Sequence, residues 1–459
     1  MKFILSLSFL LIVQLTFSQD VIVEKIEFKG LKVTKEKTVL RELLFEVGDT
    51  IDVISLNKKI EISRRNIEKQ WLFNFTEIDT KIEGNRVSVV VDVVERWYVW
   101  PYPILEISER NFNVFYDSLR ASNFTDFSRL NYGVFLNWYN FRGRNELLLI
   151  KFRKGYKEHY QFEYQIPYVN KKKNIGVAVG VELFRMKKYH YKTFNNSLLY
   201  VESESDHFKD LRTSIALQYK AGIHASHQML LQRNSAQPSP EINHLINNFL
   251  PNSKENFSYY QLTYLFNIDK RNSVSYPTEG SFREVQLDYF EGINSDYNDI
   301  ILTTKTEQHY NLHPRWLIGN SLKFKLSTND TKPYILNESL GFEDYARGYE
   351  YYVIDGEHYW LTKTALKFAL VPKRKLEIPY LKISQFNKAH YSYYLTIFAD
   401  MGKVYDSQYG DDNSLSNTLL SSQGISLDFV TYYDKLLRLE YSRNHLNEWG
   451  FFIHFSNPF

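Results

Sequence analysis

Residues 321–327 read SLKFKLS, in which three apolar side chains alternate with two lysines. In an extended backbone, successive side chains point to opposite faces, so this stretch would present one apolar and one charged face. The same alternation recurs in REVQLDY, residues 283–289, and in LLRLEYS, residues 436–442. A period of two that recurs in many short segments predicts a large antiparallel sheet.

Two architectures fit such strands, a soluble sandwich and a transmembrane barrel. From Trp97 to Phe459, segments of about ten residues end in Tyr, Phe or Trp, and tight turns alternate with long polar loops. The polar face carries Lys, Glu and Arg, which a packed sandwich core would leave unpaired. Sixteen or seventeen segments of this kind can be counted, and the even number, sixteen, fits a single-chain bacterial barrel. We therefore expect a transmembrane antiparallel β-barrel of sixteen strands over residues 97–459.

Composition excludes several classes of protein. The chain has 459 residues, 16% of them aromatic, and no cysteine, which excludes a disulfide framework or a thiolate metal site. The formal net charge is only +3, so nucleic acid is not an expected partner. No metal or cofactor motif occurs, and we expect none to be bound.

The first residues have the order of a secretory signal peptide. Lys2 precedes a short apolar run from Phe3 to Phe17, and the small Ser18 follows. The run is too short to span a bilayer comfortably as a helix. We expect residues 1–18 to be removed on export.

Residues 19–96 mix helical and strand periods and predict a small α+β domain. VIVEKIEFKG, residues 21–30, reads as a strand, and KEKTVLRELLF, residues 35–45, reads as a helix. Ser55 is the expected N-cap of a second helix, and a hairpin turns at Gly84–Asn85. The second helix should place four apolar residues on one face: Leu56, Ile60, Ile67 and Trp71.

Five stretches together resemble one known family. They are ERWYVWPYPILEISERNF at 95–112, NFRGR at 140–144, DKRNSVSYPTEG at 269–280, ARGY at 346–349 and FADMG at 398–402. In this order they resemble the BamA/TamA superfamily, in which periplasmic POTRA domains precede a sixteen-stranded outer-membrane barrel. Residues 19–96 resemble a single POTRA domain. The hairpin motif is carried by Asp269, Arg271, Pro277 and Gly280.

The resemblance implies a role for ARGY as the tip of a long loop, residues 327–356, that folds into the barrel. Arg347 would pair with Asp400 on the barrel wall, beside Gly348, Tyr349 and Gly402. A planar guanidinium can hold a carboxylate by two bonds. Where many relatives have an acidic residue after this loop, LTKTALKFAL offers Lys367, which leaves the second partner of Arg347 open.

The resemblance also implies function. The chain would assist the insertion or translocation of proteins at the outer membrane of a Gram-negative bacterium, by strand addition at a POTRA edge and by a lateral seam in the barrel. Its partners would be outer-membrane lipids, extended client proteins and accessory periplasmic or lipoprotein subunits. The client-docking edge is expected at Phe75, Thr76, Glu77, Ile78, Asp79, Thr80, Lys81 and Ile82. The terminal strand would carry an insertion signal at Gly450, Ile453, Phe455 and Phe459.

Two other functions remain open from the sequence. An accessory or lipid-handling barrel could bind another envelope complex through its POTRA domain. A barrel hydrolase is disfavoured, because no G-x-S-x-G, H-E-x-x-H or P-loop motif occurs. We expect the chain not to be an enzyme.

Overall fold

The computed structural model describes the chain except residues 1–19, 108–115, 117–118, 126–129, 171, 173, 203–204, 223, 378–387, 432–434 and 457–459. The expected signal peptide and Phe459 lie outside the described residues. The chain divides into two compact units, Met1–Arg96 with Arg142–Arg144 and Trp97–Phe141 with Asn145–Phe459. Within the described part, the helices are all too short or too polar to cross a membrane.

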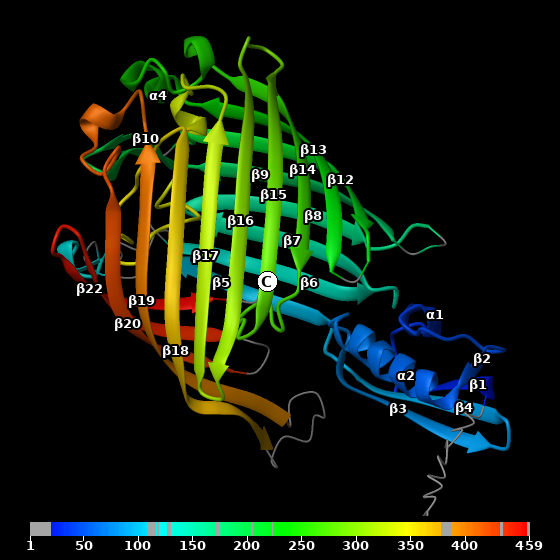
Figure 1. Ribbon diagram of the computed structural model, residues 1–459. Helices are drawn as coiled ribbons and strands as arrows, with labels where there is room; N and C mark the ends of the chain where they lie inside the picture. Colours follow the sequence, from blue (N-terminus) through cyan, green and yellow to red (C-terminus); the bar gives the residue numbers. More distant parts are fainter. Residues whose placement is uncertain are drawn as a thin grey trace, which may run out of the picture. The chain divides into compact units, whose positions relative to one another are not determined.

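The first unit is a four-stranded sheet with two helices (Figure 1). The sheet order is β2-β1-β4-β3, in which β1 and β4 are parallel and the other pairs are antiparallel. Alternate residues of β4 are fully buried, as expected for a sheet with one face covered. The elements are β1 Asp20–Lys29, α1 Glu36–Leu40, β2 Thr50–Asp52, α2 Val53–Glu68, β3 Phe73–Glu83 and β4 Arg86–Glu95.

Local details of this unit differ from the sequence prediction. Helix α1 has five residues, and the short strand β2 was not predicted. The N-cap of α2 is Asp52, whose Oδ1 accepts a hydrogen bond from the backbone N–H of Ser55 at 2.9 Å. The prediction of Ser55 as the N-cap is therefore wrong. The cap lies three residues earlier, because the carboxylate of Asp52 accepts the backbone N–H of Ser55. Trp71 lies beyond the helix with a φ of 58°.

The second unit is a sixteen-stranded antiparallel sheet, which curls round into a barrel (Figure 1). Its order runs β22-β21-β20-β19-β18-β17-β16-β15-β14-β13-β12-β9-β8-β7-β6-β5. The strands are β5 Val99–Ile107, β6 Leu130–Phe141, β7 Glu146–Gly155, β8 Lys157–Ile166, β9 Ile175–Met186, β12 Phe208–Lys220, β13 Ala225–Pro238, β14 Phe257–Asp269, β15 Gly280–Gly292, β16 Asn298–His313, β17 Trp316–Ser327, β18 His358–Glu377, β19 Lys388–Tyr405, β20 Leu420–Val430, β21 Leu436–Asn444 and β22 Trp449–Ser456.

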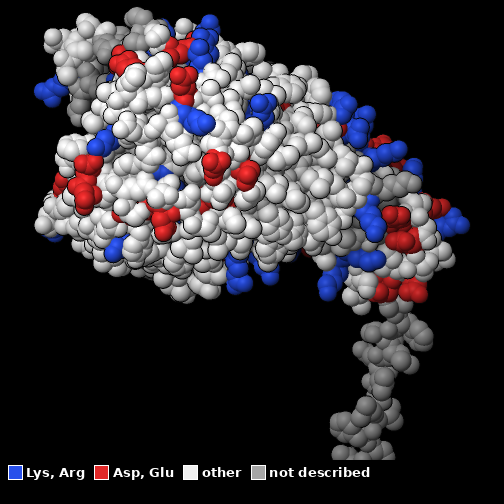
Figure 2. Space-filling model, turned by 90° about the horizontal axis from the view of Figure 1, so that it is seen from above, with Lys and Arg blue, Asp and Glu red and all other residues white. Residues whose placement is uncertain are grey.

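Alternation places the apolar side chains outside the barrel and the polar ones inside. On β15, Val285, Leu287 and Tyr289 are each about two-fifths exposed, whereas Asp288 is 5% exposed. Figure 2 shows a broad area without charged side chains on the face in view. An apolar outer surface with a polar interior is the arrangement of a membrane barrel and the reverse of a soluble one.

Long connections gather at one end of the barrel, at the top of Figure 1. A two-stranded hairpin, β10 Lys188–Phe194 and β11 Ser197–Glu202, joins β9 to β12. Its turn binds two other loops, since the N–H of Asn195 donates to the carbonyl of Asp412 and the N–H of Val353 donates to the carbonyl of Asn196, both at 2.9 Å. The short helices of this end are α4 Pro240–Leu245, η1 Pro251–Ser253, η2 Tyr334–Leu336 and η3 Gly410–Asp412.

The ladder has two ends. Strand β5 pairs with β6, and β22 pairs with β21. Among the described residues, no ladder joins β5 to β22. The seam of the barrel therefore lies between its first and last strands.

Candidate functional site: the barrel interior and its inward loop

The loop between β17 and β18, residues 328–357, carries its ARGY tip into the barrel. The side chain of Arg347 is 7% exposed and that of Asp400, on β19, is fully buried. Nε of Arg347 donates to Oδ2 of Asp400 at 2.9 Å, and a terminal guanidinium nitrogen donates to Oδ1 at 2.5 Å. The backbone N–H of Arg347 also donates to Oδ2, at 3.0 Å. One carboxylate thus accepts three hydrogen bonds from a single residue.

Two further contacts complete the surroundings of the guanidinium. Its Cζ lies 3.8 Å from the ring centroid of Phe398, and a terminal nitrogen donates to the carbonyl of Thr364 at 3.4 Å. Lys367 does not bind this group: its Nζ lies over the ring of Tyr276, 4.0 Å from the centroid. The question of a second partner for Arg347 is thus answered by a backbone carbonyl and an aromatic face.

The neighbours of Arg347 are held by other strands. Gly348 has a φ of +85°, and its carbonyl accepts from Nδ2 of Asn444 at 3.0 Å. The hydroxyl of Tyr349 donates to the carbonyl of Ser421 at 2.9 Å. Gly402 is not at the tip, because the atoms nearest to a Cβ there belong to Trp360 and Leu361 of β18.

The hairpin motif between β14 and β15 is also held by a guanidinium. Arg271 donates to both carboxylate oxygens of Asp269, at 3.0 and 2.7 Å, and to Oε2 of Glu307 at 2.9 Å. Gly280 has a φ of +103°, and a Cβ there would lie 2.2 Å from the carbonyl oxygen of Lys270. Pro277 lies in the turn between these groups, half-buried.

Sequence reasoning missed the residue by which this hairpin reaches the far wall. Tyr276 is buried, and its hydroxyl donates to Oδ2 of Asp428, on β20, at 2.8 Å. Nε of Arg438 donates to Oδ1 of the same carboxylate at 2.8 Å. The ring of Tyr276 stacks on Tyr394, with centroids 4.8 Å apart. The nearby Pro277 and Gly280 marked the turn, but only the barrel topology brings Tyr276 to β20.

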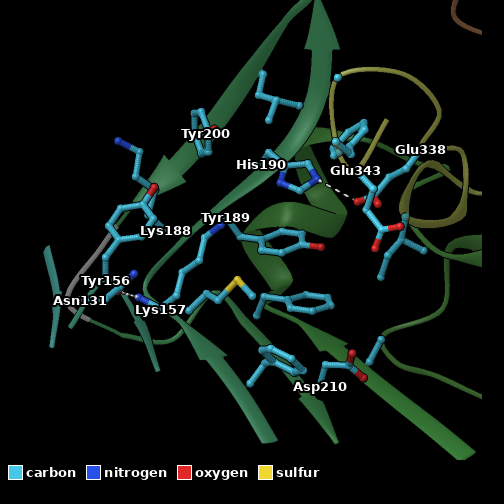
Figure 3. Close-up of a pocket in the computed structure, with 18 of the residues that line it drawn as sticks. Asn131, Tyr156, Lys157, Lys188, Tyr189, His190, Tyr200, Asp210, Glu338 and Glu343 are labelled. Carbon is cyan, nitrogen blue, oxygen red and sulfur yellow. Dashed lines mark hydrogen bonds and ion pairs between the residues drawn. The ribbon is translucent and has the colours of Figure 1, made fainter. Parts of the chain in front are cut away.

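A cavity of about 1280 Å³ lies inside the barrel unit, and Figure 3 shows part of its lining. Side chains of hairpin β10–β11 and of the inward loop face each other there: Nε2 of His190 is 4.0 Å from Oε1 of Glu338. Burial raises the pKa of Glu338 to about 7 and lowers the pKa of His190 to about 3. Burial likewise raises the pKa of Asp355, in the same loop, to about 7.

The cavity extends to the seam. Glu106 of β5 lines it on one side, and His454 and Phe455 of β22 line it on the other. Ile453 and Phe455 are 57% and 68% exposed and follow the outward alternation of β22, yet both contribute to the lining. Gly450, the other expected residue of the terminal signal in the described range, lies opposite Ser442 of β21.

The predicted docking residues of the first unit lie on one edge strand. Phe75 to Ile82 fall within β3, which pairs with β4 and forms the edge of its sheet. Six of these eight residues are exposed: Phe75, Glu77, Asp79, Thr80, Lys81 and Ile82.

Comparison with known proteins identifies the family. A model described as the Omp85 superfamily domain matches residues 140–441, and the POTRA model, described as surface antigen variable number repeat, matches residues 21–96. No curated protein matches the sequence.

Solved structures share the fold at low identity. BamA from Haemophilus ducreyi lacking POTRA domains 1–3 is 15% identical, with a TM-score of 0.57 over 95% of this chain and 83% of that one. CdiB from Escherichia coli is 10% identical, with a TM-score of 0.58 over 96% and 75% of the two chains. CdiB from Acinetobacter baumannii is 11% identical, with a TM-score of 0.53 over 94% and 73%.

These matches settle the class of the protein. The Omp85 match covers more than half of the chain, and a POTRA match precedes it. The chain belongs to the Omp85 superfamily, as an outer-membrane barrel protein of a Gram-negative bacterium with a single POTRA domain in the periplasm.

Proposed function

We propose that this protein assists the insertion or translocation of client proteins at the outer membrane, through strand addition at the POTRA edge and a lateral seam in the barrel. The main support for this function is the seam between β5 and β22. The first and last strands share no ladder among the described residues, and the internal cavity reaches both of them. A client strand could therefore pair with the edge of β5 or of β22, at a place that the cavity also reaches.

Physical chemistry favours exchange at this place. A strand in lipid needs partners for its backbone groups, and an edge of a barrel can supply them. Opening costs least where few ladder bonds must break, whereas β12 to β19 are held by ladders of ten or more paired residues. The seam is thus the part of the wall at which opening requires the least free energy.

The POTRA edge supports the first step of the same process. Strand β3 is the edge strand of its sheet in the periplasm, next to the buried strand β4, and seven of its eleven residues are exposed. An extended client can add to such an edge by main-chain hydrogen bonds with little dependence on its sequence.

Depletion of the protein, followed by quantitative proteomics of the outer membrane, tests the proposal. We expect a defined set of outer-membrane or exported proteins to fall in abundance, while lipid asymmetry changes only afterwards. If lipid asymmetry changes first and the protein content stays normal, the chain is instead a lipid-handling or accessory barrel and the proposal is wrong.

A further inference from the structure

Three side chains that the proposed function does not use meet inside the barrel. Glu350 comes from the inward loop, Glu440 from β21 and His454 from β22. Their possible ligand atoms all lie within 4.8 Å of one another. Nε2 of His454 is 3.6 Å from Oε1 of Glu350 and 3.9 Å from Oε2 of Glu440.

The two carboxylates are buried without donors. The side chain of Glu350 is 6% exposed and that of Glu440 is fully buried. Among the described residues, none donates a hydrogen bond to any of their four oxygens, and Nε2 of His454 has no hydrogen-bond partner either. Leaving buried charged groups unsatisfied is costly, and most such groups in proteins have a partner.

Neighbouring cations are already paired with other acids. Arg347 donates two side-chain hydrogen bonds to Asp400, and Arg438 donates two to Asp428. The cluster thus holds two acids and one imidazole, without a guanidinium of its own. A divalent cation would supply the missing positive charge.

The imidazole is oriented for such a role. Nδ1 of His454 faces the hydroxyl of Tyr345 at 3.4 Å, and the two rings stack with centroids 5.9 Å apart. The other nitrogen, Nε2, faces the carboxylates. A histidine ligand is usually held in this way, with one nitrogen fixed by a neighbouring group and the other directed to the metal.

We propose that Glu350, Glu440 and His454 form a binding site for a divalent transition-metal ion, with Zn²⁺ as its best representative. Ligands about 2.0–2.1 Å from a tetrahedral ion lie roughly 3.4 Å apart, close to the separations of Nε2 from the two carboxylates. Two carboxylates and an imidazole suit Zn²⁺ with water in the fourth position, whereas Mg²⁺ and Ca²⁺ prefer oxygen ligands alone. The ion would join the inward loop to the last two strands, beside the seam.

Metal binding can be measured on the whole mature protein, purified in detergent and stripped with a chelator. Zn²⁺ is titrated in competition with a chromogenic chelator, and heat-modifiable migration on a gel reports that each variant is folded. We expect one ion per chain, and a loss of affinity of at least tenfold in Glu350→Gln, Glu440→Gln and His454→Asn. The matched control is Glu343→Gln, an exposed carboxylate of the same loop, which should keep the affinity of the wild type.

Two outcomes would overturn the proposal. Equal Zn²⁺ affinity in the wild type and in Glu350→Gln would place the ion elsewhere. Absence of Zn²⁺ binding would mean that a protonated His454 bridges the two acids without a metal. Because Glu350 lies in a loop rather than in a barrel strand, its variant keeps the test decisive even where Glu440→Gln fails to fold.

A second readout concerns the loop itself and is independent of any client. Adding Zn²⁺ to the stripped protein should slow proteolysis within residues 328–357 several-fold in the wild type and in Glu343→Gln. It should have no effect in Glu350→Gln, and Mg²⁺ should have no effect in any of them. Equal protection with and without Zn²⁺ in the wild type would contradict the proposed link between loop and strands.

Discussion

At the residue scale, the contact between Arg347 and Asp400 engages both oxygens of one buried carboxylate. A lysine cannot reproduce this geometry, since an ammonium is a point-like donor. The backbone N–H of Arg347 adds a bond that would survive replacement of the side chain. The contact between Arg347 and Asp400 therefore combines side-chain and main-chain hydrogen bonds. Its role in holding the loop stays a prediction.

We predict that Arg347→Ala destabilises the docked loop by about 1–3 kcal/mol, because it leaves a buried carboxylate without its cation. Arg347→Lys should restore only part of this loss. Asp400→Asn should resemble Arg347→Ala, and the double variant should be no worse than either single one, since each removes the same pair. Limited proteolysis of residues 328–357 measures the effect. Arg443→Ala, at a guanidinium that binds Asn447 and stacks on Trp449, is the control. Additive defects would contradict the pairing.

A pH dependence follows from two acids of the same loop. Burial raises the pKa of Glu338 and of Asp355 to about 7, above their ordinary values of 4.5 and 3.8. Between those values the docked loop binds more protons than the released one, so its stability is greatest in acid and falls as the pH rises through 7. These two acids should thus raise protease protection of the loop at pH 5.5 relative to pH 8, whereas His190, whose pKa burial lowers to about 3, favours the docked loop at the higher pH.

The variants Glu338→Gln and Asp355→Asn should each remove the loss of protection that ionisation of the acid causes between pH 5.5 and pH 8, since each amide stays neutral at every pH. Glu343→Gln, at an exposed position of the same loop, should change the profile less, because its carboxylate contributes less than burial does to the raised pKa of Glu338. If the ratio of protection at pH 5.5 to protection at pH 8 is the same in both amide variants as in the wild type, these acids do not control the docking of the loop.

Some contacts in the barrel interior could be predicted from the sequence and others could not. Arg347 could be selected because ARGY resembles a family motif, and Asp400 because FADMG does. Tyr276 and Asp428 are 152 positions apart, and no local pattern joins them. The cluster of Glu350, Glu440 and His454 was missed for the same reason, since a metal site assembled from a loop and two strands has no characteristic spacing.

At the element scale, the hairpin between β14 and β15 depends on the backbone of Gly280. Its φ of +103° is strained for any other residue, and a Cβ there would collide with the carbonyl of Lys270 at 2.2 Å. Gly222, in the turn between β12 and β13, has a φ of +127°, but its two chain neighbours aside, no described residue has an atom within 4 Å of its Cβ position. A substitution at Gly222 would therefore meet backbone strain alone, whereas one at Gly280 would meet both strain and a steric collision.

Gly280→Ala should accordingly cost more than Gly222→Ala, whose cost is on the order of 1–2 kcal/mol from strain alone. The midpoint of heat-induced unfolding, followed by gel migration, measures both. If the two variants lose the same stability, the collision at Gly280 is relieved by movement of the turn, and the hairpin is not the rigid element described here.

The edge of the POTRA sheet allows a second test at this scale. A photo-reactive side chain placed at Glu77 or Asp79 of β3 should cross-link to an unfolded outer-membrane barrel presented from urea, because both positions are exposed on the edge strand. Lys58, exposed on α2, is the control and should give no product. Equal labelling at Lys58 would mean that clients contact the domain without adding to β3.

The barrel strands could be predicted from the sequence, whereas some shorter strands could not. Period-two alternation predicted the barrel strands, because lipid outside and water inside impose opposite demands on successive residues. Strand β2 and the hairpin β10–β11 were missed. Three residues are too few to show a period, and KYHYKTF and SLLYVE pack against loops on a mixed surface rather than between lipid and water.

At the scale of the whole molecule, the barrel unit is one continuous series of paired strands with a single interruption among the described residues. Fifteen neighbouring strand pairs form ladders, and the described parts of β5 and β22 do not. The inward loop and the hairpin at Tyr276 fasten the interior to β18–β21, on the side of the last strands. Rigid fastening beside a weak seam would confine opening to one place, which is what exchange of a client strand requires.

A disulfide bond across the seam is the most direct test of lateral opening between β5 and β22. The chain has no cysteine, so a pair introduced at Leu105 and Ile453, or at Leu105 and Phe455, would provide the only thiols. All three positions are exposed, on β5 and β22. A matched tether joins Tyr441 to Phe451, which are already partners across the β21–β22 ladder.

The measurement is outer-membrane assembly of client proteins in a strain that depends on the tethered variant, with and without a reductant. If the barrel opens between β5 and β22, the oxidised seam tether should block assembly and reduction should restore it. The tether between β21 and β22 should have no effect in either state. Normal assembly with a fully oxidised seam tether would contradict a lateral opening between β5 and β22.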